Sequence, residues 1–210
     1  MAKLLAVCVG KAEHIEGYSP LTGINKRAVS GTVPIGPQGI AEDAILDRQH
    51  HGGSDQAIYI YFQGDYDWWA REGVASTPGL FGENLVIDGP ISANTAIGDR
   101  YHIGDCLLEV TYHRTPCMTF AAKMNDKFWV KRFHRANRPG AYCRVLTPGT
   151  IEAGMDITVT PYAGERVTVS ELMSFDTSKD LPLDFMRRAV TTPIREKTRF
   201  KYETRLADLF

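Results

Sequence analysis

The stretch Tyr112-His113-Arg114-Thr115-Pro116-Cys117-Met118 joins a strand-like run, Leu107 to Thr111, to a segment with helical periodicity, Phe120 to His134. A cysteine between a strand and a helix start lies where the helix dipole and the nearby Arg114 both favour a thiolate. That placement is typical of a metal ligand or a nucleophile. A small buried apolar side chain is the common alternative for a cysteine, and this stretch leaves both interpretations open.

Outward from this stretch, short runs of strand-forming residues alternate with Gly and Pro. Such runs at regular spacing predict a closed or nearly closed β-barrel. Between them, residues 63–72 predict an amphipathic helix that ends at Gly73, and the aromatic side chains around it are expected in the core. The strand-like runs, with their turns, are Leu4 to Val9, Gln56 to Tyr61, Phe81 to Ile87, Ala96 to Asp105, Pro139 to Leu146 and Gly149 to Val159.

The pattern changes after about Glu165, where apolar residues recur at helical spacings and Arg and Lys become frequent. We therefore predict a mainly β protein with α-helices: a β-barrel domain over residues 1–164 with peripheral helices, and a short C-terminal helical appendage over residues 165–210. Pro182 and Pro193 interrupt the helical pattern, so two or at most three helices are expected there. The basic face of this tail is either a solvated surface or a docking surface for an acidic partner.

The composition and net charge limit the classes of function that the protein can have. The 210 residues are 43% hydrophobic and 23% charged, as in an ordinary globular protein. The formal net charge of −1 gives no overall attraction to nucleic acid or to an anionic membrane, so neither is expected as a partner. There is no signal-peptide pattern and no membrane-length apolar run. The four cysteines are scattered without CxxC pairing, which predicts reduced thiols and a cytoplasmic location.

A second polar stretch, residues 47–56, contains an adjacent histidine pair and an adjacent glycine pair. Neighbouring histidines cannot share one face of a strand, so His50 and His51 are a poor metal chelate. The glycines allow close backbone approach, so the loop suits a polar ligand such as a phosphate. A hairpin turn with incidental histidines is the alternative. A nucleophilic pair of Cys117 with a histidine also remains open.

Several motifs then occur in a fixed order along the first roughly 160 residues, and as a set they resemble the MOSC domain family, related to the C-terminal part of molybdenum-cofactor sulfurases. The overall length and the helical tail are most similar to its YiiM-like branch. The motifs are His50-His51-Gly52-Gly53-Ser54-Asp55-Gln56-Ala57, Phe81-Gly82-Glu83-Asn84-Leu85, Ile97-Gly98-Asp99-Arg100, Arg114-Thr115-Pro116-Cys117 and Gly140-Ala141-Tyr142-Cys143-Arg144-Val145.

The resemblance implies a MOSC-type β-barrel that binds the molybdenum cofactor, with Cys117 as the metal ligand. It implies cationic side chains for the cofactor's phosphate and pterin, for which the candidates are Lys26, Arg27, Arg114 and Arg138. The loop and a nearby amide would line the pocket, through Gly52, Gly53, Asp55, Gln56 and Asn84. A histidine of the His50–His51 pair would donate protons, since imidazole titrates near neutrality.

The implied activity is a molybdenum-dependent oxidoreductase that reduces N-hydroxylated compounds, such as 6-hydroxylaminopurine-type bases, to the amine. The chain shows no flavin, haem or iron–sulfur motif, so a separate reductase is expected to donate electrons. The tail would either pack on the barrel or mediate a homodimer. Two alternatives remain: a carrier module with Cys117 as a persulfide or cofactor-anchoring thiol, and an unrelated β-barrel binding protein with Cys117 in its core.

Overall fold

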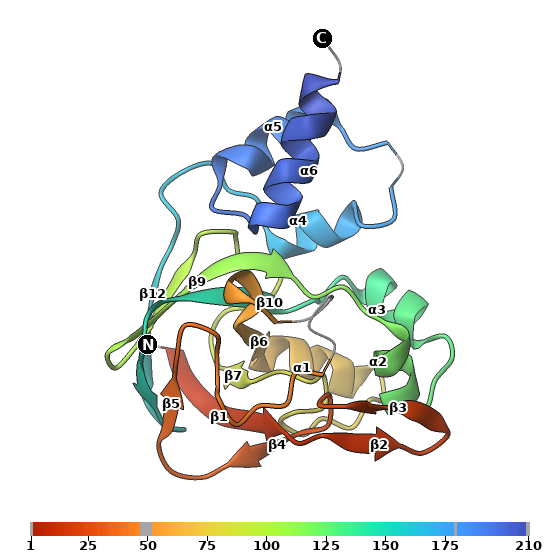
Figure 1. Cartoon of the computed structure of the whole chain (residues 1–210), viewed down its shortest axis with the longest axis vertical. Coiled ribbons are helices and arrows are strands. Elements are labelled where there is room, and N and C mark those ends of the chain that lie inside the picture. The colour runs from red at the N-terminus through yellow and green to blue at the C-terminus, as the bar shows by residue number, and fades with distance from the viewer. Residues whose placement is uncertain (1, 47–51, 179, 209–210) are drawn as a thin grey trace.

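Seven β-strands close into a barrel in a computed structural model that describes residues 2–46, 52–178 and 180–208 (Figure 1). Neighbouring strands are antiparallel except for one parallel pair, β6 and β7. This arrangement confirms the predicted β-barrel with helices. Around the wall the strands are β12 (Asp156–Thr160), β8 (Arg100–Ile103), β9 (Cys106–His113), β10 (Ala141–Thr147), β6 (Ile58–Phe62), β7 (Leu85–Ile87) and β1 (Ala2–Gly10).

The first strand closes the barrel because it is long enough to pair with three others. Its start pairs with β12 and its middle with β7. Its end pairs with β4 (Lys26–Val29), which extends the sheet beyond the barrel. Closure leaves no unpaired edge at this seam. The β1–β4 register places Lys26 directly opposite Gly10, at the end of the barrel where the cavity described below opens.

An aromatic cluster fills the space between the barrel and three helices, α1 (Gln63–Arg71), α2 (Met118–Lys123) and α3 (Trp129–Ala136). The Tyr61 and Phe81 rings stack with centroids 4.3 Å apart, and Trp69 lies 5.0 Å from Trp129. These rings are fully buried, so they are core and not a platform for bases. The helical segment expected over residues 120–134 is broken in two, because Asn125 takes a left-handed conformation with φ of 47°.

Two small sheets and a short turn complete the barrel region. The hairpin of β2 (Glu13–Ile15) and β3 (Tyr18–Thr22) lies near α2, and Tyr18 shares a 2.8 Å hydrogen bond with Thr119. Elsewhere β5 (Val33–Ile35) pairs with β11 (Gly149–Ile151). The 3₁₀ turn η1 (Ser54–Gln56) lies just before β6.

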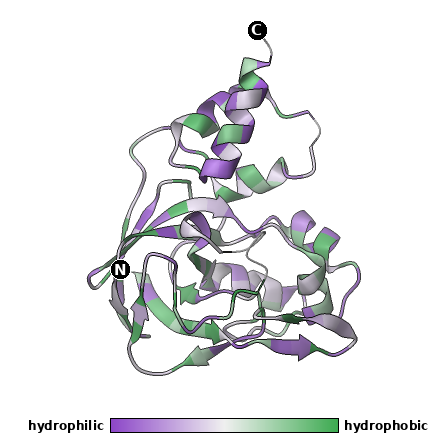
Figure 2. Ribbon diagram, in the orientation of Figure 1, coloured by the Kyte–Doolittle hydropathy of each residue, from purple (hydrophilic) through white to green (hydrophobic). Residues whose placement is uncertain are grey.

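Three helices follow the last strand within the described residues: α4 (Val169–Ser174), α5 (Leu183–Thr191) and α6 (Glu196–Ala207). Pro182 is the N-cap of α5 and Pro193 separates α5 from α6, as their effect on helices requires. Figure 2 shows both hydrophilic and hydrophobic residues on these three helices. Among the described residues, no helix has the length and apolar character needed to cross a membrane. The division into domains at residues 164 and 165 stays a prediction.

Candidate functional site

A cavity of about 320 Å³ opens between the end of the barrel and the β2–β3 hairpin. Small-molecule sites commonly have volumes of about 300–1,000 Å³ with a few polar groups on an apolar wall. The cavity has this character, with Lys26, Asp43, Asn84, Arg114 and Cys117 among its polar lining residues. Its apolar lining includes Pro20, Leu21, Ile24, Ile45 and Leu46, and the rings of Tyr59 and Tyr142 add flat surfaces.

Cys117 lies on the cavity wall as the N-cap of α2, and it is half-buried. The segment before it is anchored where Thr115 donates a 3.0 Å hydrogen bond to the carboxylate of Asp176. Because α2 has six residues, its dipole adds little, and the nearby positive charge comes chiefly from Arg114. A thiolate at Cys117 would interact favourably with that guanidinium, and the same interaction contributes to the raised pKa of Arg114.

The Arg114 side chain is almost completely buried, with 4% of its surface exposed, and it lines the cavity. Its Nη1 donates a 2.7 Å hydrogen bond to the Phe81 carbonyl, and its guanidinium lies 4.2 Å above the Phe120 ring. Its Nε has no acceptor among the described residues. An unpartnered donor on a buried cation is costly, so the site fits a ligand that brings an anionic or acceptor group.

A second cation lies on the cavity wall in a buried ion pair. The Lys26 ammonium pairs with the Asp43 carboxylate, which also accepts hydrogen bonds from the Gly10 N–H at 2.8 Å and from Asn84 Nδ2 at 2.9 Å. The Asn84 side chain is oriented by the Tyr59 N–H, which donates to its Oδ1 at 3.1 Å. Burial lowers the pKa of Lys26, and the charge of Asp43 opposes this effect.

Behind this wall lies a further pair of buried charges that does not line the cavity. The Glu83 carboxylate accepts hydrogen bonds from Tyr66 and from the Phe81 N–H, and burial raises its pKa. Lys123 donates a 2.9 Å hydrogen bond to the Ile24 carbonyl, and burial lowers its pKa to about 8. These contacts hold the backbone on which the lining residues Ile24 and Gly82 are placed.

The structure brings six of the residues suggested by sequence onto one cavity. Gly52 has a positive φ of 80°, and a Cβ there would lie 3.1 Å from the Ile45 side chain, so this position favours glycine. The six are Lys26, Gly52, Gln56, Asn84, Arg114 and Cys117.

Four other candidates lie elsewhere. Arg27 pairs with Glu13 at the surface, and Arg138 pairs with Asp65 at 2.7 Å. Gly53 and Asp55 are close in sequence to the cavity but are not among its lining residues. His50 and His51 lie outside the described residues.

Among the lining residues that the sequence did not suggest are Asp43, Tyr59 and Tyr142. Tyr59 had been assigned to the core from its aromatic segment, and Tyr142 stood inside a quoted motif without a role. Asp43 lies in a stretch without periodicity, and its role depends on contacts with Lys26, Gly10 and Asn84, which are 17, 33 and 41 positions away.

The donor set limits the kind of metal that the cavity could hold. Within the part of the chain that the structure describes, no group of three or more His, Cys, Asp and Glu side chains could hold a metal ion. A metal bound here would therefore bring most of its own ligands and take one soft sulfur donor from Cys117. A pterin dithiolene with a phosphate tail fits, because the cavity also offers a guanidinium with one N–H that has no acceptor among the described residues, an ammonium and two tyrosine rings.

Fold and cavity together define a small β-barrel with one cysteine in a cationic, partly aromatic pocket. The MOSC domain model matches residues 47–158, more than half of the chain, and the protein belongs to the MOSC domain family. A relative named Uncharacterized protein YflK, from Bacillus subtilis, is 29% identical over 171 residues, covering 79% of this chain and 76% of its own length. Protein YiiM of Escherichia coli is 27% identical over 169 residues, covering 79% and 75%.

Two further similarities extend this result. A protein named Reductase from Gibberella moniliformis is 29% identical over 174 residues, which are 77% of this chain but 30% of that protein. The crystal structure of YiiM from Geobacillus stearothermophilus superposes with a TM-score of 0.80 at 26% identity, covering 98% of this chain and 100% of that one. The shared fold therefore includes the C-terminal helices as well as the barrel.

The four cysteines are expected to differ strongly in alkylation by iodoacetamide at pH 8, because the thiolate is the reacting species. Burial raises the pKa of Cys8 to about 12 and that of Cys106 to about 11, and it also raises the pKa of Cys143. Cys117 lines the cavity and should be labelled first, at least about 100-fold faster than the others. Peptide mass spectrometry of the folded chain measures this; equal labelling of Cys8 and Cys117 would contradict it.

Proposed function

We propose that this protein binds the molybdenum cofactor through Cys117 and reduces N-hydroxylated compounds to the corresponding amines. The observation that carries the proposal is that Cys117 and the buried Arg114, with its unpartnered Nε, line one cavity. Membership of the MOSC family and the reductase-named fungal relative support it.

When bound, the cofactor would supply two-electron redox chemistry at molybdenum. The reaction balances as R–NHOH plus two electrons and two protons giving R–NH₂ and water. The N–O bond breaks and the hydroxyl leaves as water. The protein must therefore hold the cofactor, orient the substrate and deliver two protons.

Several residues of the cavity and of the adjacent loop have a proposed part in this reaction. The Cys117 thiolate holds the metal as a soft donor. Arg114 and Lys26 would hold anionic and acceptor groups of the cofactor, and the Tyr59 and Tyr142 rings would offer flat surfaces to its pterin. His50 or His51 is proposed as the proton donor. Asn84 holds the Asp43 carboxylate in place on the cavity wall through its hydrogen bond.

Other residues suggested by the sequence have a smaller role in the proposed site or none. Gly52 and Gln56 contribute backbone and side-chain surface to the wall. Arg27 and Arg138 have no part in the proposed site, because their guanidiniums are paired with Glu13 and Asp65.

The apolar rim of the cavity favours a flat, largely uncharged substrate. Its outer residues are apolar, including Leu21 and Leu46, which are about half exposed. A purine base with a hydroxylamino group matches this surface better than a charged compound does. Electrons would come from a separate reductase, and the fungal relative is more than three times as long as the region it shares with this chain. A thiolate ligand suits a reducing compartment, so the proposal places the protein in the cytoplasm.

The experiment is production in a host that makes the cofactor, followed by metal analysis, pterin fluorescence and an activity assay. We expect near-stoichiometric molybdenum and pterin, and reduction of 6-hydroxylaminopurine by reduced methyl viologen with one amine formed per two electrons. Absence of both metal and pterin, even after reconstitution with cofactor, would overturn the proposal. Labelled sulfur held at Cys117 without metal would favour the carrier function instead.

A further inference from the structure

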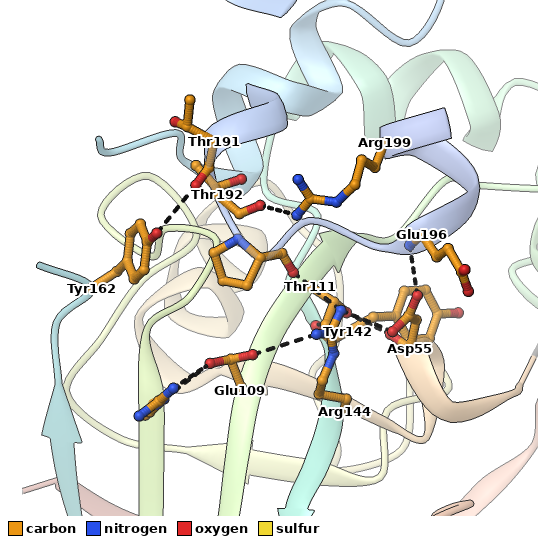
Figure 3. A network of polar contacts seen from close by, with 12 residues as sticks. Asp55, Glu109, Thr111, Tyr142, Arg144, Tyr162, Thr191, Thr192, Glu196 and Arg199 are labelled. Atoms are coloured by element: carbon orange, nitrogen blue, oxygen red, sulfur yellow. Dashed lines mark hydrogen bonds and ion pairs between the residues drawn. The ribbon is translucent and has the colours of Figure 1, made fainter. Parts of the chain in front are cut away.

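The turn η1 forms part of the cavity wall and is also attached to the C-terminal helices. Gln56, at its end, and the following Ala57 line the cavity. Asp55, one residue earlier, is not a lining residue, and its carboxylate lies against the start of α6 (Figure 3). One short turn thus contacts both the proposed ligand site and the C-terminal tail.

Asp55 supplies a helix cap from a distant part of the sequence. Its Oδ2 accepts a 2.7 Å hydrogen bond from the N–H of Glu196, the first residue of α6, and the two residues are 141 positions apart. Arg195, at the N-cap position, makes no capping hydrogen bond with its own side chain. A carboxylate at the N-terminus of this twelve-residue helix meets unsatisfied N–H groups and the positive end of the dipole.

The barrel wall holds the same turn from its other side. Arg144 of β10 forms a 2.9 Å ion pair with Asp55 Oδ1, and the Thr111 hydroxyl of β9 donates to the Asp55 carbonyl. The same two wall residues also hold the tail: Arg144 donates to the Pro193 carbonyl at 3.2 Å, and the Thr111 carbonyl accepts the Arg195 N–H at 3.1 Å. Figure 3 shows these contacts converging between the barrel and the start of α6.

We propose that Asp55 is a positioning residue through which docking of α6 fixes the cavity wall at Gln56 and Ala57. No residue of the described tail is among the lining residues, yet the tail completes the set of contacts that holds η1. Removing the Asp55 carboxylate should release η1 from both Glu196 and Arg144. The cavity would then lose part of its preformed shape, and bound cofactor would be retained less well.

The test measures hydrogen exchange of residues 52–57 in the full chain without cofactor, and separately the molybdenum and pterin content of protein made in a cofactor-producing host. The cofactor content rests on the proposed function, whereas the hydrogen exchange does not. The variants are Asp55→Ala, Asp55→Asn and Arg144→Met. The matched control is Arg166→Met, because Arg166 also ties the tail to the barrel, through a bidentate pair with Asp99 at 2.9 and 3.2 Å, but neither residue lines the cavity.

For Asp55→Ala we expect exchange of residues 52–57 to become about tenfold faster, and cofactor content to fall at least about threefold. Asp55→Asn should lie between the wild type and Asp55→Ala, since an amide oxygen still accepts the Glu196 N–H but no longer pairs with Arg144. Arg144→Met should also raise exchange of this segment. Arg166→Met leaves the buried Asp99 carboxylate without its counter-charge and should lower the free energy of unfolding, but local exchange of residues 52–57 and cofactor content should be unchanged.

The proposal is overturned if Asp55→Ala accelerates exchange only at the start of α6 and leaves residues 52–57 protected, because Asp55 would then be a helix cap and nothing more. An equal effect of Arg166→Met on residues 52–57 would also overturn it, since any loosening of the tail would then suffice. If the wild type binds no cofactor, the proposed function fails, but the exchange measurement still decides the role of Asp55.

Discussion

Replacing Cys117 with alanine is expected to abolish retention of molybdenum and pterin while the fold stays intact. Loss of a group that only orients a metal ligand already costs about 10–100-fold in metal affinity, so loss of the proposed ligand itself should cost more. The side chain is half-buried at the N-cap of a short helix, and its removal should lower the free energy of unfolding by less than about 1 kcal/mol. Metal analysis measures the molybdenum content, pterin fluorescence the pterin content, and urea unfolding the free energy of unfolding.

The matched control for this variant is Cys106→Ala. Cys106 is a buried cysteine of the barrel wall that does not line the cavity, so the variant should keep molybdenum and pterin. Metal retained by Cys117→Ala at the wild-type level would show that Cys117 is not the ligand. Equal loss from both variants would point to a general loss of cavity structure.

Replacing Lys26 with methionine is expected to lower the free energy of unfolding by about 3–5 kcal/mol, because it leaves the buried Asp43 carboxylate without its counter-charge. The two side chains are 9% and 4% exposed, so water cannot replace the lost partner. The Gly10 N–H and the Asn84 amide still bond Asp43 but bring no charge. Urea unfolding at pH 7 measures the effect, and cofactor content should fall with it because Lys26 lines the cavity.

Two further variants make this test specific. Arg27 is the next residue of the same strand, and its pair with Glu13 is mostly exposed, so Arg27→Met should change the stability by less than about 1 kcal/mol. Adding Asp43→Asn to Lys26→Met removes the uncompensated charge and should restore most of the lost stability, though not the cofactor. Equal destabilisation by Lys26→Met and Arg27→Met would refute the argument.

The barrel was predictable because its signals are local. Alternating β-formers between glycines indicated the short strands, and residues 63–72 indicated α1, whose bounds are Gln63–Arg71. The break between α2 and α3 was missed because it depends on Asn125 adopting a left-handed backbone conformation, which periodicity does not reveal. Prolines correctly marked the start of α5 and the segment between α5 and α6.

The candidate site was predictable only in part. The motif ending at Cys117 and the glycine at position 52 were recognisable as short patterns, and the structure places both on the cavity. The arginines could not be ranked by sequence, because Arg27, Arg114 and Arg138 look alike there. Arg114 is distinguished by its almost complete burial on the cavity wall, whereas Arg27 and Arg138 have carboxylate partners in Glu13 and Asp65.

The sequence by itself determined the alternation of strands and helices and the ordered motifs of a MOSC domain, because these depend on residues close together in the chain. Only the tertiary structure decided which charges meet. Lys26 reaches Asp43 across the end of the barrel, and Asp55 caps a helix that begins 141 residues later. Ionic and hydrogen-bonded partners depend on distance and burial after closure of the barrel, and sequence separation carries no information about either.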